Sequence, residues 1–320
     1  MTLLDIRNLS KTYPGAGGST VKAVSDVSFS IESGEVLGVV GESGCGKSTL
    51  GRALLRLIEP SEGEIHFDGK DLMGLSRGQL KPVRKDLQII FQDPFGALNP
   101  RHTVGGIIGE PLKVHRIGTR AERAARVAEL LDLVGLPADA AKRYPHEFSG
   151  GQRQRIAIAR ALALDPKLLV ADEAVSALDV SIQSQIINLI ADLQKRLALS
   201  IIFISHDLSV IRHVSDRIAV MYLGRIVEIG PSEELMTNPK HPYTQALLSA
   251  IPRPNVPRTG RIVLRGELPD PSNPPAGCAF HTRCPHVMDV CHSVRPKLSR
   301  PAGGEPDSPL EVACHLYEAA

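Results

Sequence analysis

The sequence predicts an α/β fold in which a mostly parallel sheet is covered by helices on both faces. Three short runs are apolar throughout: Val36–Val40, Leu168–Ala171 and Ile201–Ile204. Runs of this kind are typical of strands buried on both faces of a parallel sheet. Helical patterns lie between them, and this alternation of strand and helix indicates the α/β class.

Length and composition are those of an ordinary water-soluble chain. The 320 residues are enough for about two domains with cores of their own. Hydrophobic residues make up 42% and charged residues 22%, and the net charge of +2 argues neither for nor against a role with nucleic acid. No apolar run approaches the roughly 18 residues of a membrane span, and Asp5 and Arg7 lie where a signal peptide is apolar. We therefore expect a cytoplasmic protein whose membrane role comes from its partners.

The elements around the apolar runs follow from local signals. A glycine-rich turn follows Val40 and leads into a helix from about Lys47. Asp165 and Pro166 end the helix that precedes the second run, because proline cannot continue a helix. The helix before the third run is expected to bury one face. That face consists of Ile182, Ile186, Leu189, Leu193 and Leu197.

Two regions depart from the alternation of strand and helix. Residues 97–165 contain helical patterns and no strand-like run, which predicts a helical insertion in the α/β core. After residue 250, the stretches 251–261 and 266–278 are rich in proline. This composition predicts an extended tail that is ordered by something other than a large core.

The stretch "GESGCGKST" fits the phosphate-loop pattern G-x-x-x-x-G-K-[ST] and lies between a predicted strand and a predicted helix. Its glycines let backbone N–H groups turn towards phosphate oxygens at a helix N-terminus. Lys47 is expected to reach the outer phosphates and Ser48 to ligate Mg²⁺. The residues expected to bind nucleotide here are Gly41, Ser43, Gly44, Cys45, Gly46, Lys47, Ser48 and Thr49.

The stretch "LLVADE" places two carboxylates after a buried strand. Asp172 can hold Mg²⁺ through water, and Glu173 is placed to take a proton from an attacking water molecule. Any buried strand that ends in acids looks like this, so the hypothesis depends on the phosphate loop upstream.

A second anion-binding helix start is predicted in "HEFSGGQRQRIAIARAL". Ser149 is a good N-cap, and Gly150 and Gly151 leave backbone N–H groups bare at the positive end of the helix dipole. On its own this pattern would favour a plain glycine turn that caps a surface helix. Because one triphosphate already has its loop at residues 41–49, we expect this end to take the γ-phosphate of a nucleotide carried by another subunit.

Six motifs stand in the order found in the ATP-binding subunits of ABC transporters, and the chain resembles that family over about its first 235 residues. They are "GESGCGKST" for the Walker A loop, "FQDP" with Gln92 for the Q-loop, "FSGGQ" for the LSGGQ signature, "LLVADE" for Walker B, "SALD" for the D-loop, and "ISHD" with His206 for the switch histidine. Tyr13 stands where the family stacks an aromatic ring on adenine. The departures, Phe148 for Leu and Ala174-Val175 for Pro-Thr, remove no catalytic group.

The resemblance implies a P-loop NTPase: an ABC cassette with a RecA-like core, a helical subdomain and a small cysteine-containing C-terminal extension. It implies a head-to-tail dimer in which each ATP lies between one subunit's Walker A loop and the other's signature. The signature residues so implied are Ser149, Gly150, Gly151 and Gln152. The roles implied by position are Lys47 at the β- and γ-phosphates, Ser48, Gln92 and Asp172 at Mg²⁺, Glu173 as general base, and His206 at the γ-phosphate.

Within the ABC family the chain resembles the dipeptide and oligopeptide importer ATPases, with "LNPR" and "YPHEFSGGQ" leaning towards the oligopeptide F-type subunit. This implies a cassette over residues 1–235, with its helical subdomain at about 97–165, and an extension over 236–320. The implied partners are a paralogous ATPase subunit, two transmembrane permease subunits and an extracytoplasmic solute-binding protein. The chain would then lie peripherally on the cytoplasmic face of the membrane.

Four of the five cysteines, Cys278, Cys284, Cys291 and Cys314, lie close together in the sequence and lack the paired C-x2-C of common zinc sites. They could bind an iron–sulfur cluster or zinc, or be unpaired buried thiols, whereas disulfides are disfavoured in the cytoplasm. The resemblance implies a [4Fe–4S] cluster, with zinc as the alternative. Cys45 is expected to be inert. The nearby histidines are expected to have solvated or structural roles: His281, His286, His292 and His315.

The leading hypothesis is therefore an ATP hydrolase that energises import of peptides or a related small solute. The alternative is a soluble ABC-type ATPase that acts on nucleic acid, with the cysteine tail as a zinc module. Such proteins usually carry paired cassettes or a long coiled-coil insertion, and the single cassette here has neither. A purely regulatory subunit is disfavoured by the intact Glu173 and His206. The sequence does not identify the solute, because selectivity belongs to the permease and the binding protein.

Overall fold

The chain folds into two compact units. The structure, a computed structural model, describes residues 1–15, 18–251, 262–264, 266–302 and 308–318. The first unit comprises Met1–Leu3, Glu32–Glu35 and Lys70–Ile204, and the second comprises Leu4–Ile31, Val36–Gly69 and Ser205–Ala320. The units interleave along the sequence, so the division at residue 235 inferred above stays a prediction.

The first unit contains three parallel strands in the order β8-β7-β6: β6 (Leu87–Ile90), β7 (Leu168–Asp172) and β8 (Ser200–Ile204). Every residue of β7 and β8 is buried. This confirms the two apolar runs as buried parallel strands, since neither strand has a solvent-facing side that would require polar residues.

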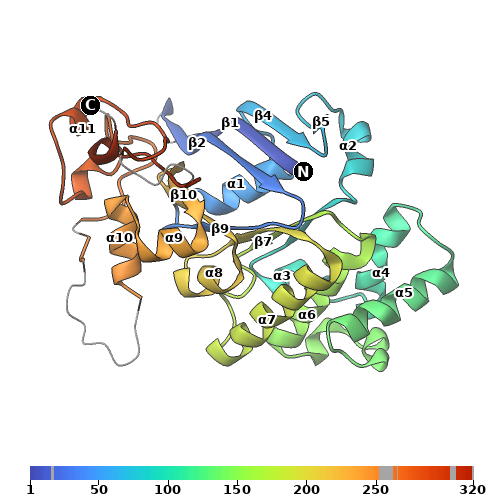
Figure 1. Ribbon diagram of the computed structural model, residues 1–320. Helices are drawn as coiled ribbons and strands as arrows, with labels where there is room; N and C mark the ends of the chain where they lie inside the picture. Colours follow the sequence, from blue (N-terminus) through green and yellow to red (C-terminus); the bar gives the residue numbers. More distant parts are fainter. Residues whose placement is uncertain (16–17, 252–261, 265, 303–307, 319–320) are drawn as a thin grey trace. The chain divides into compact units, whose positions relative to one another are not determined.

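Helices make up most of the rest of the first unit (Figure 1). Residues 97–165, all of which are described, contain no strand, as predicted. Within this region α4 (Val104–Val114) packs against both α5 (Arg120–Leu133) and α6 (Gly150–Ala161). The remaining helices of the unit are α2 (Arg77–Val83), α3 (Pro94–Ala97) and α7 (Val180–Leu197).

The arginines of α6 connect the segments of this region through hydrogen bonds to backbone carbonyls. Arg155 donates to the carbonyl of Val134 at 2.6 Å, and Arg160 donates to the carbonyl of Ala97 at 2.6 Å. Arg153 donates from Nε to the carbonyl of Phe148 at 2.9 Å. Their charged groups therefore satisfy backbone carbonyls at helix ends and turns.

The buried face predicted for α7 is partly wrong. Ile186 and Leu193 are buried as expected, but Leu197 is 42% exposed. The helix buries Ile187 and Ile190 in addition, so its covered face is rotated from the predicted one. Helix α6 approaches the predicted face at Ile182, where a Cβ on Gly151 would lie 2.5 Å from Cγ2 of the isoleucine.

The second unit holds the first apolar run, β3 (Val36–Val40), which pairs in parallel with β9 (Arg217–Tyr222). An antiparallel hairpin joins β9 to β10 (Arg225–Pro231), and β11 (Glu311–Val312) adds to its far edge. Helix α8 (Leu208–Val214) packs closely on β3, since a Cβ on Gly38 would lie 2.4 Å from Cγ2 of Ile211. The other helices are α1 (Lys47–Leu54), α9 (Ser232–Thr237), α10 (Pro242–Ser249) and α11 (Val290–Ser293).

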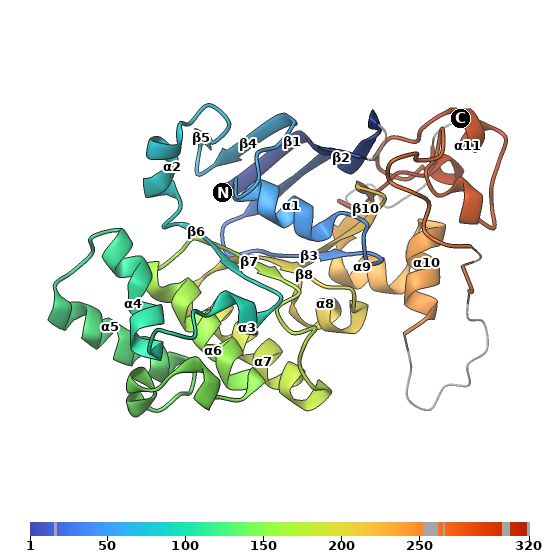
Figure 2. The same cartoon turned by 180° about the vertical axis from the view of Figure 1, so that it is seen from behind.

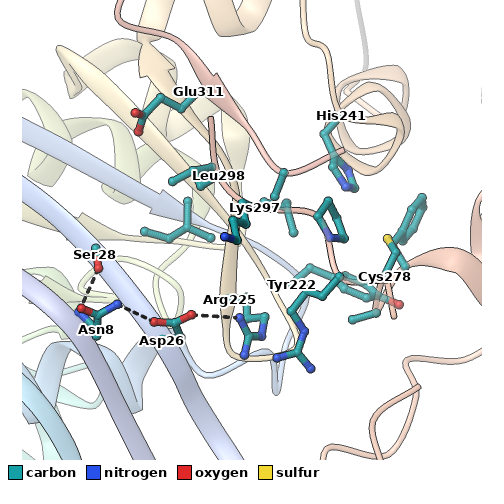
Figure 3. A pocket seen from close by; sticks show the side chains of 17 residues that line it. Asn8, Asp26, Ser28, Tyr222, Arg225, His241, Cys278, Lys297, Leu298 and Glu311 are labelled. Atoms are coloured by element: carbon teal, nitrogen blue, oxygen red, sulfur yellow. Dashed lines mark hydrogen bonds and ion pairs between the residues drawn. The ribbon is translucent and has the colours of Figure 1, made fainter. Parts of the chain in front are cut away.

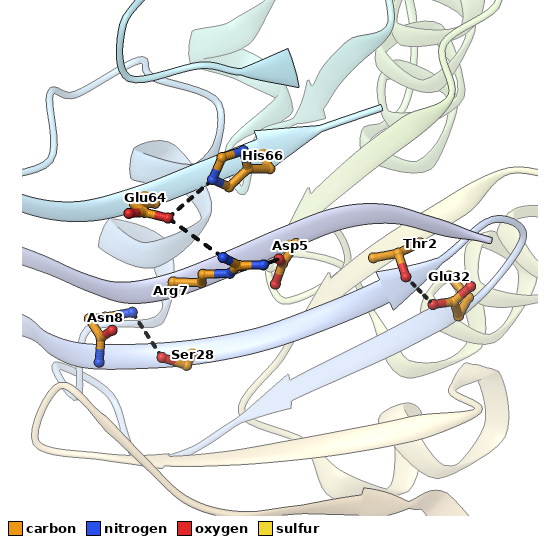
Figure 4. A network of polar contacts seen from close by, with 8 residues as sticks. All are labelled: Thr2, Asp5, Arg7, Asn8, Ser28, Glu32, Glu64 and His66. Atoms are coloured by element: carbon orange, nitrogen blue, oxygen red, sulfur yellow. Dashed lines mark hydrogen bonds and ion pairs between the residues drawn. The ribbon is translucent and has the colours of Figure 1, made fainter. Parts of the chain in front are cut away.

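A separate antiparallel sheet in the second unit was not predicted from the sequence. It places β1 (Thr2–Pro14) between β2 (Thr20–Glu32) and β4 (Glu62–Phe67). Its apolar residues alternate with polar ones and bury one face of the sheet. On the other face Arg7 contacts Asp5 at 2.7 Å and Glu64 at 4.0 Å, as Figure 4 shows.

The C-terminal extension returns to the strands of the second unit. The N–H of Ala313 donates to the carbonyl of Val227 on β10 at 2.8 Å. The backbone N–H of Lys22 on β2 donates to the carbonyl of Pro271 at 3.3 Å. Both views show the segment that carries α11 beside α10 and β10 (Figures 1 and 2). Of the proline-rich stretch 251–261, residues 252–261 lie outside the described residues, so the prediction of an extended tail is untested there.

Candidate functional site: a phosphate loop, an acidic strand end and a glycine helix start

The predicted phosphate loop connects β3 to α1 in the second unit. Gly46 is the N-cap of α1 and has φ 104°, in the left-handed region that favours glycine. Neighbouring backbone also excludes larger residues. A Cβ on Gly46 would lie 2.0 Å from the carbonyl oxygen of Ala23, and one on Gly41 would lie 2.2 Å from that of Met221. Packing and backbone conformation together therefore require both glycines.

Lys47 directs its ammonium group back into this loop. The side chain is buried, and Nζ donates to the carbonyl of Gly41 at 2.8 Å and to that of Glu42 at 3.0 Å. No side chain caps the start of α1, so the N–H groups of its first turn face the loop with the positive end of the helix dipole. This is the arrangement of backbone donors that a phosphate group requires.

Cys45 lies within the same loop and is 1% exposed. Burial raises the pKa of its thiol, and the charge of Lys47 offsets that rise only in part. A buried thiol with a raised pKa carries little thiolate and is unreactive. The structure thus gives a physical reason for the expectation that Cys45 is inert.

The two predicted carboxylates lie at the end of β7 in the first unit. Asp172 is fully buried, and Glu173 follows it with φ 47°, a conformation rare for residues other than glycine. Gln92 donates from Nε2 to Oε2 of Glu173 at 2.7 Å. Ser176 donates from Oγ to the carbonyl of Glu173 at 3.0 Å. The Q-loop, Walker B and D-loop residues of this unit therefore meet at Glu173.

The helix start predicted as a second anion site is formed by α6. Ser149 is its N-cap, and it forms a reciprocal pair with Gln152. The Gln152 N–H donates to Ser149 Oγ at 3.4 Å, and the Ser149 N–H donates to Gln152 Oε1 at 3.0 Å. The N–H groups of Gly150 and Gly151 have no hydrogen-bond acceptor among the described residues. Bare donors at a helix start can bind an anion.

Two further predicted residues belong to the second unit. His206 follows β8 by two residues, in the turn before α8. Tyr13 lies near the end of β1 and is 37% exposed, with the ammonium of Lys11 5.0 Å from its ring centroid. The side chain is thus partly exposed to solvent, with Lys11 over its ring.

The sequence analysis missed a set of contacts between the phosphate loop and the C-terminal extension. Arg283 forms a bidentate ion pair with Glu42 at 2.7 and 3.1 Å. The hydroxyl of Tyr243 accepts from the N–H of Glu42 at 2.8 Å. The only available signal was the stretch "HPYTQALL" around Tyr243, which pattern reasoning did not connect with the loop.

A buried acid and a buried histidine next to this set were also missed. Burial raises the pKa of Glu228 to about 7, although it accepts from the N–H of Lys240 at 2.6 Å and of His241 at 3.1 Å. Burial lowers the pKa of His241 to about 3, and its Nδ1 accepts from the N–H of Tyr243 at 3.1 Å. His241 is therefore neutral and caps α10.

The four C-terminal cysteines are free thiols gathered in one region of the extension. Burial raises the pKa of Cys278 and Cys284, and raises that of Cys314 to about 12. The negative charges that the other three cysteines carry when ionised also raise the pKa of Cys314, and such effects connect those three with one another, so all four lie within electrostatic reach. Yet the described residues include no group of three or more Cys, His, Asp or Glu side chains in a geometry that could hold a metal ion. The predicted iron–sulfur or zinc site is not supported in this arrangement.

A cavity of about 490 Å³ lies in the second unit between β1, β2, β10 and the extension (Figure 3). Asn8 donates to Asp26 at 2.7 Å, and Asp26 lies 3.6 Å from Arg225. Lys297 and Cys278 line it from the extension. No residue of the phosphate loop lines it, so it is distinct from the predicted nucleotide site.

Sequence comparison identifies the two parts of the chain. A family model described as "ABC transporter" matches residues 24–176, and one described as "Oligopeptide/dipeptide transporter, C-terminal region" matches residues 227–291. The oligopeptide transport ATP-binding protein AppF of Bacillus subtilis (strain 168) is 55% identical, with 99% of this chain and 98% of AppF covered. The putative oligopeptide transport ATP-binding protein YkfD of the same organism is 52% identical, covering 100% of this chain and 97% of YkfD.

Solved structures agree on the fold. A dimeric structure of the ATP-binding cassette MJ0796 bound to ADP and Pi is 31% identical, with a TM-score of 0.66 over 72% of this chain and 99% of that one. The cbiO1 protein of Clostridium perfringens, part of the cbiONQ ABC transporter complex, is also 31% identical, with a TM-score of 0.66 over 74% of this chain and 91% of that one. No helix in the described part of the chain is long and apolar enough to cross a membrane. With its P-loop α/β cassette and C-terminal region, the chain belongs to the ATP-binding, ATP-hydrolysing proteins of oligopeptide and dipeptide ABC transporters.

Proposed function

We propose that this chain hydrolyses ATP to drive import of peptides or a related small solute through separate membrane subunits. The observation that carries the proposal is the match along the whole chain to AppF, including the C-terminal region that follows the cassette. The motifs of the cassette and the free N–H groups of Gly150 and Gly151 support it.

In this proposal nucleotide is bound by the loop of one cassette and by the α6 start of a second cassette. Lys47 neutralises the outer phosphates, and Glu173 accepts the proton of the attacking water. The N–H groups of Gly150 and Gly151 bind the γ-phosphate of the partner's nucleotide. Mg²⁺ stabilises the developing phosphate charge when bound, and the assignment of its ligands to Ser48, Gln92 and Asp172 stays a prediction, as do the contacts of His206 and Tyr13.

The proposed assembly contains a paralogous ATPase, two permease subunits and an extracytoplasmic binding protein, with this chain on the cytoplasmic face of the membrane. Its support is the naming of the relatives as transport ATP-binding proteins together with the lack of a membrane-crossing helix in the described residues.

Anaerobic affinity purification of this chain from its native membrane tests the assembly. We expect two apolar multi-span proteins and a second cassette to co-purify, and reconstituted vesicles to take up labelled peptide only with ATP. Recovery of the chain alone, or with nucleic acid that dissociates as salt rises, would overturn the proposal.

We also propose that the four cysteines of the extension take up an iron–sulfur cluster, with zinc as the alternative, after local rearrangement of the thiols. Their mutual electrostatic reach supports this, as does the N–H of His286, which donates to Sγ of Cys284 at 3.4 Å. Hydrogen bonds of that kind stabilise sulfur ligands of clusters. Metal analysis and visible absorption of anaerobically purified protein test it. Wild-type protein should carry iron and sulfide and Cys284→Ser protein should not, whereas metal-free wild-type protein would exclude both metals.

A further inference from the structure

The phosphate loop is tied to the C-terminal extension through a single residue, Glu42. Its carboxylate accepts hydrogen bonds from the two terminal guanidinium nitrogens of Arg283, although the two residues are 241 positions apart in the sequence. The Arg283 side chain is 6% exposed and that of Glu42 is 30% exposed. A bidentate pair that is mostly shielded from water fixes both distance and orientation more firmly than an exposed pair.

The same residue is also held through its backbone. The N–H of Glu42 donates to the hydroxyl of Tyr243, which lies on α10 and is fully buried. Burial raises the pKa of this phenol, so it remains neutral and keeps its role as acceptor. Side chain and backbone of Glu42 are thus both fixed by residues that follow the cassette in sequence.

An aromatic cluster makes these two supports rigid. The ring of Tyr243 packs edge-on against Tyr222 of β9 with centroids 4.8 Å apart, and Phe280 lies 5.3 Å from Tyr222 and 5.5 Å from Tyr243. All three side chains are at most 1% exposed. Because Phe280 lies three residues before Arg283, the segment that carries the arginine is anchored in the same core as Tyr243.

The orientation of Glu42 matters for nucleotide because its own carbonyl, with that of Gly41, accepts hydrogen bonds from the ammonium of Lys47. The peptide groups that follow Glu42 are those expected to face the phosphates. A change in Glu42 would therefore displace both the backbone donors and the lysine. Groups already held in the binding conformation bind more tightly, because less ordering is required on association.

We propose that Arg283 and Tyr243 are positioning residues for the phosphate loop, so that the C-terminal extension sets the affinity of the cassette for ATP. The proposal rests on the assignment of residues 41–49 as the nucleotide site. It adds a role for the extension in the first step of the ATPase cycle.

Binding of a fluorescent ATP analogue with Mg²⁺ to the full chain tests this. We expect Arg283→Gln to raise the Kd about tenfold, equal to about 1.4 kcal/mol. Glu42→Gln should have a similar effect, and the double variant should be no worse than either single one. Arg283→Lys should restore part of the affinity, because lysine keeps the charge without the bidentate geometry. Steady-state turnover should show a raised KM for ATP with kcat within about twofold of wild type.

Two further variants keep the test decisive. Tyr243→Phe removes only the hydroxyl acceptor and keeps the ring in its cluster, so it should fold and still bind ATP more weakly, by about threefold. Arg295→Gln is the matched control, since this arginine lies in the same extension, is exposed, and lines the cavity to which no residue of the phosphate loop contributes. It should leave the Kd unchanged.

Additive effects of Arg283→Gln and Glu42→Gln, or lowered thermal stability of both with unchanged Kd and KM, would overturn the positioning role. Lys47→Ala separates this from failure of the nucleotide site itself. Weak binding by Lys47→Ala confirms the site, whereas wild-type affinity in that variant would remove the basis of the proposed function and of this proposal together.

Discussion

The side-chain amide of Gln92 donates a 2.7 Å hydrogen bond to the carboxylate of Glu173, which lies 81 residues further along the chain. One oxygen of the expected general base is thus occupied by the Q-loop amide. Glu173 itself is held at φ 47°, a conformation that its surroundings must maintain against an energetic cost. The hydrogen bond from Gln92 fixes the orientation of the Glu173 carboxylate. The orientation of the expected base therefore depends on the position of the Gln92 side chain.

Replacing Glu173 by Gln should slow ATP turnover by roughly 100- to 10,000-fold while ATP binding is retained, because the amide keeps the shape but accepts no proton. Single-turnover hydrolysis and nucleotide binding measure the two effects separately. Asp192→Asn, an exposed acid on α7, is the matched control and should hydrolyse ATP like wild type. Wild-type turnover by Glu173→Gln protein would show that another group is the base.

Gln92→Ala should lower kcat by about tenfold at saturating ATP and Mg²⁺, because it frees Glu173 to turn away without removing the base itself. The loss of a proposed Mg²⁺ ligand should appear separately, in the Kd for ATP measured with Mg²⁺. The comparison of kcat with the Kd is the measurement. A variant with unchanged kcat would show that the hydrogen bond does not orient the base during turnover.

A structural feature of this chain can be predicted from the sequence when it depends on residues that are neighbours along the chain. The buried strands around Val170 and Ile202 and the N-cap at Ser149 follow from a few neighbouring residues, and the structure confirms them. The buried face of α7 cannot be predicted in this way, because the packing of α6 and other elements decides which of its isoleucines are covered. The pairing of Glu42 with Arg283 cannot be predicted either, since nothing near either residue in the sequence indicates a partner 241 positions away.

The start of α6 offers a test of the two-chain site. Ser149→Glu should lower ATP turnover of the assembled transporter at least tenfold, because a carboxylate would repel phosphate from the N–H groups of Gly150 and Gly151. The binding of ATP by the phosphate loop of the same chain should persist. The local cost to stability should be about 1 kcal/mol from the lost cap.

Ser184→Glu is the matched control for this variant. It adds the same charge at an exposed position on α7, where Oγ donates only to the carbonyl of Val180. Its turnover should be that of wild type. Equal turnover in Ser149→Glu and Ser184→Glu protein would show that α6 binds no nucleotide.

Gln154 is a buried polar side chain with neither amide atom paired among the described residues. Gln154→Met keeps the length of the side chain and removes the unmet hydrogen-bonding groups, so it should raise the free energy of unfolding by about 1–3 kcal/mol. Gln194→Met is the control, because Gln194 donates to the carbonyl of Gly34 at 2.7 Å and its loss should cost about 1 kcal/mol. Urea denaturation measures both. Destabilisation by Gln154→Met would mean that the amide is satisfied by bound water.

Glu228 and His241 should give opposing contributions to the pH dependence of stability. The pKa of Glu228 rises from 4.5 to about 7 on folding, so between these values the folded chain holds a proton that the unfolded chain has lost, and stability falls as pH rises. The pKa of His241 falls from 6.5 to about 3, so between these values the unfolded chain holds the extra proton, and stability increases with pH. Between about pH 4.5 and 6.5 the two slopes, each about 1.4 kcal/mol per pH unit, should cancel.

Single substitutions should expose each slope in urea denaturation between pH 5 and 6.5. Relative to wild type, Glu228→Gln should gain stability as pH rises, because only the histidine contribution remains. His241→Asn, whose side-chain oxygen can still accept from the N–H of Tyr243, should lose stability as pH rises, because only the carboxyl contribution remains. The nearest fixed charge, that of Lys240, is present in both variants and does not alter the sign. Parallel pH profiles for wild type and both variants would show that neither group changes its protonation on folding.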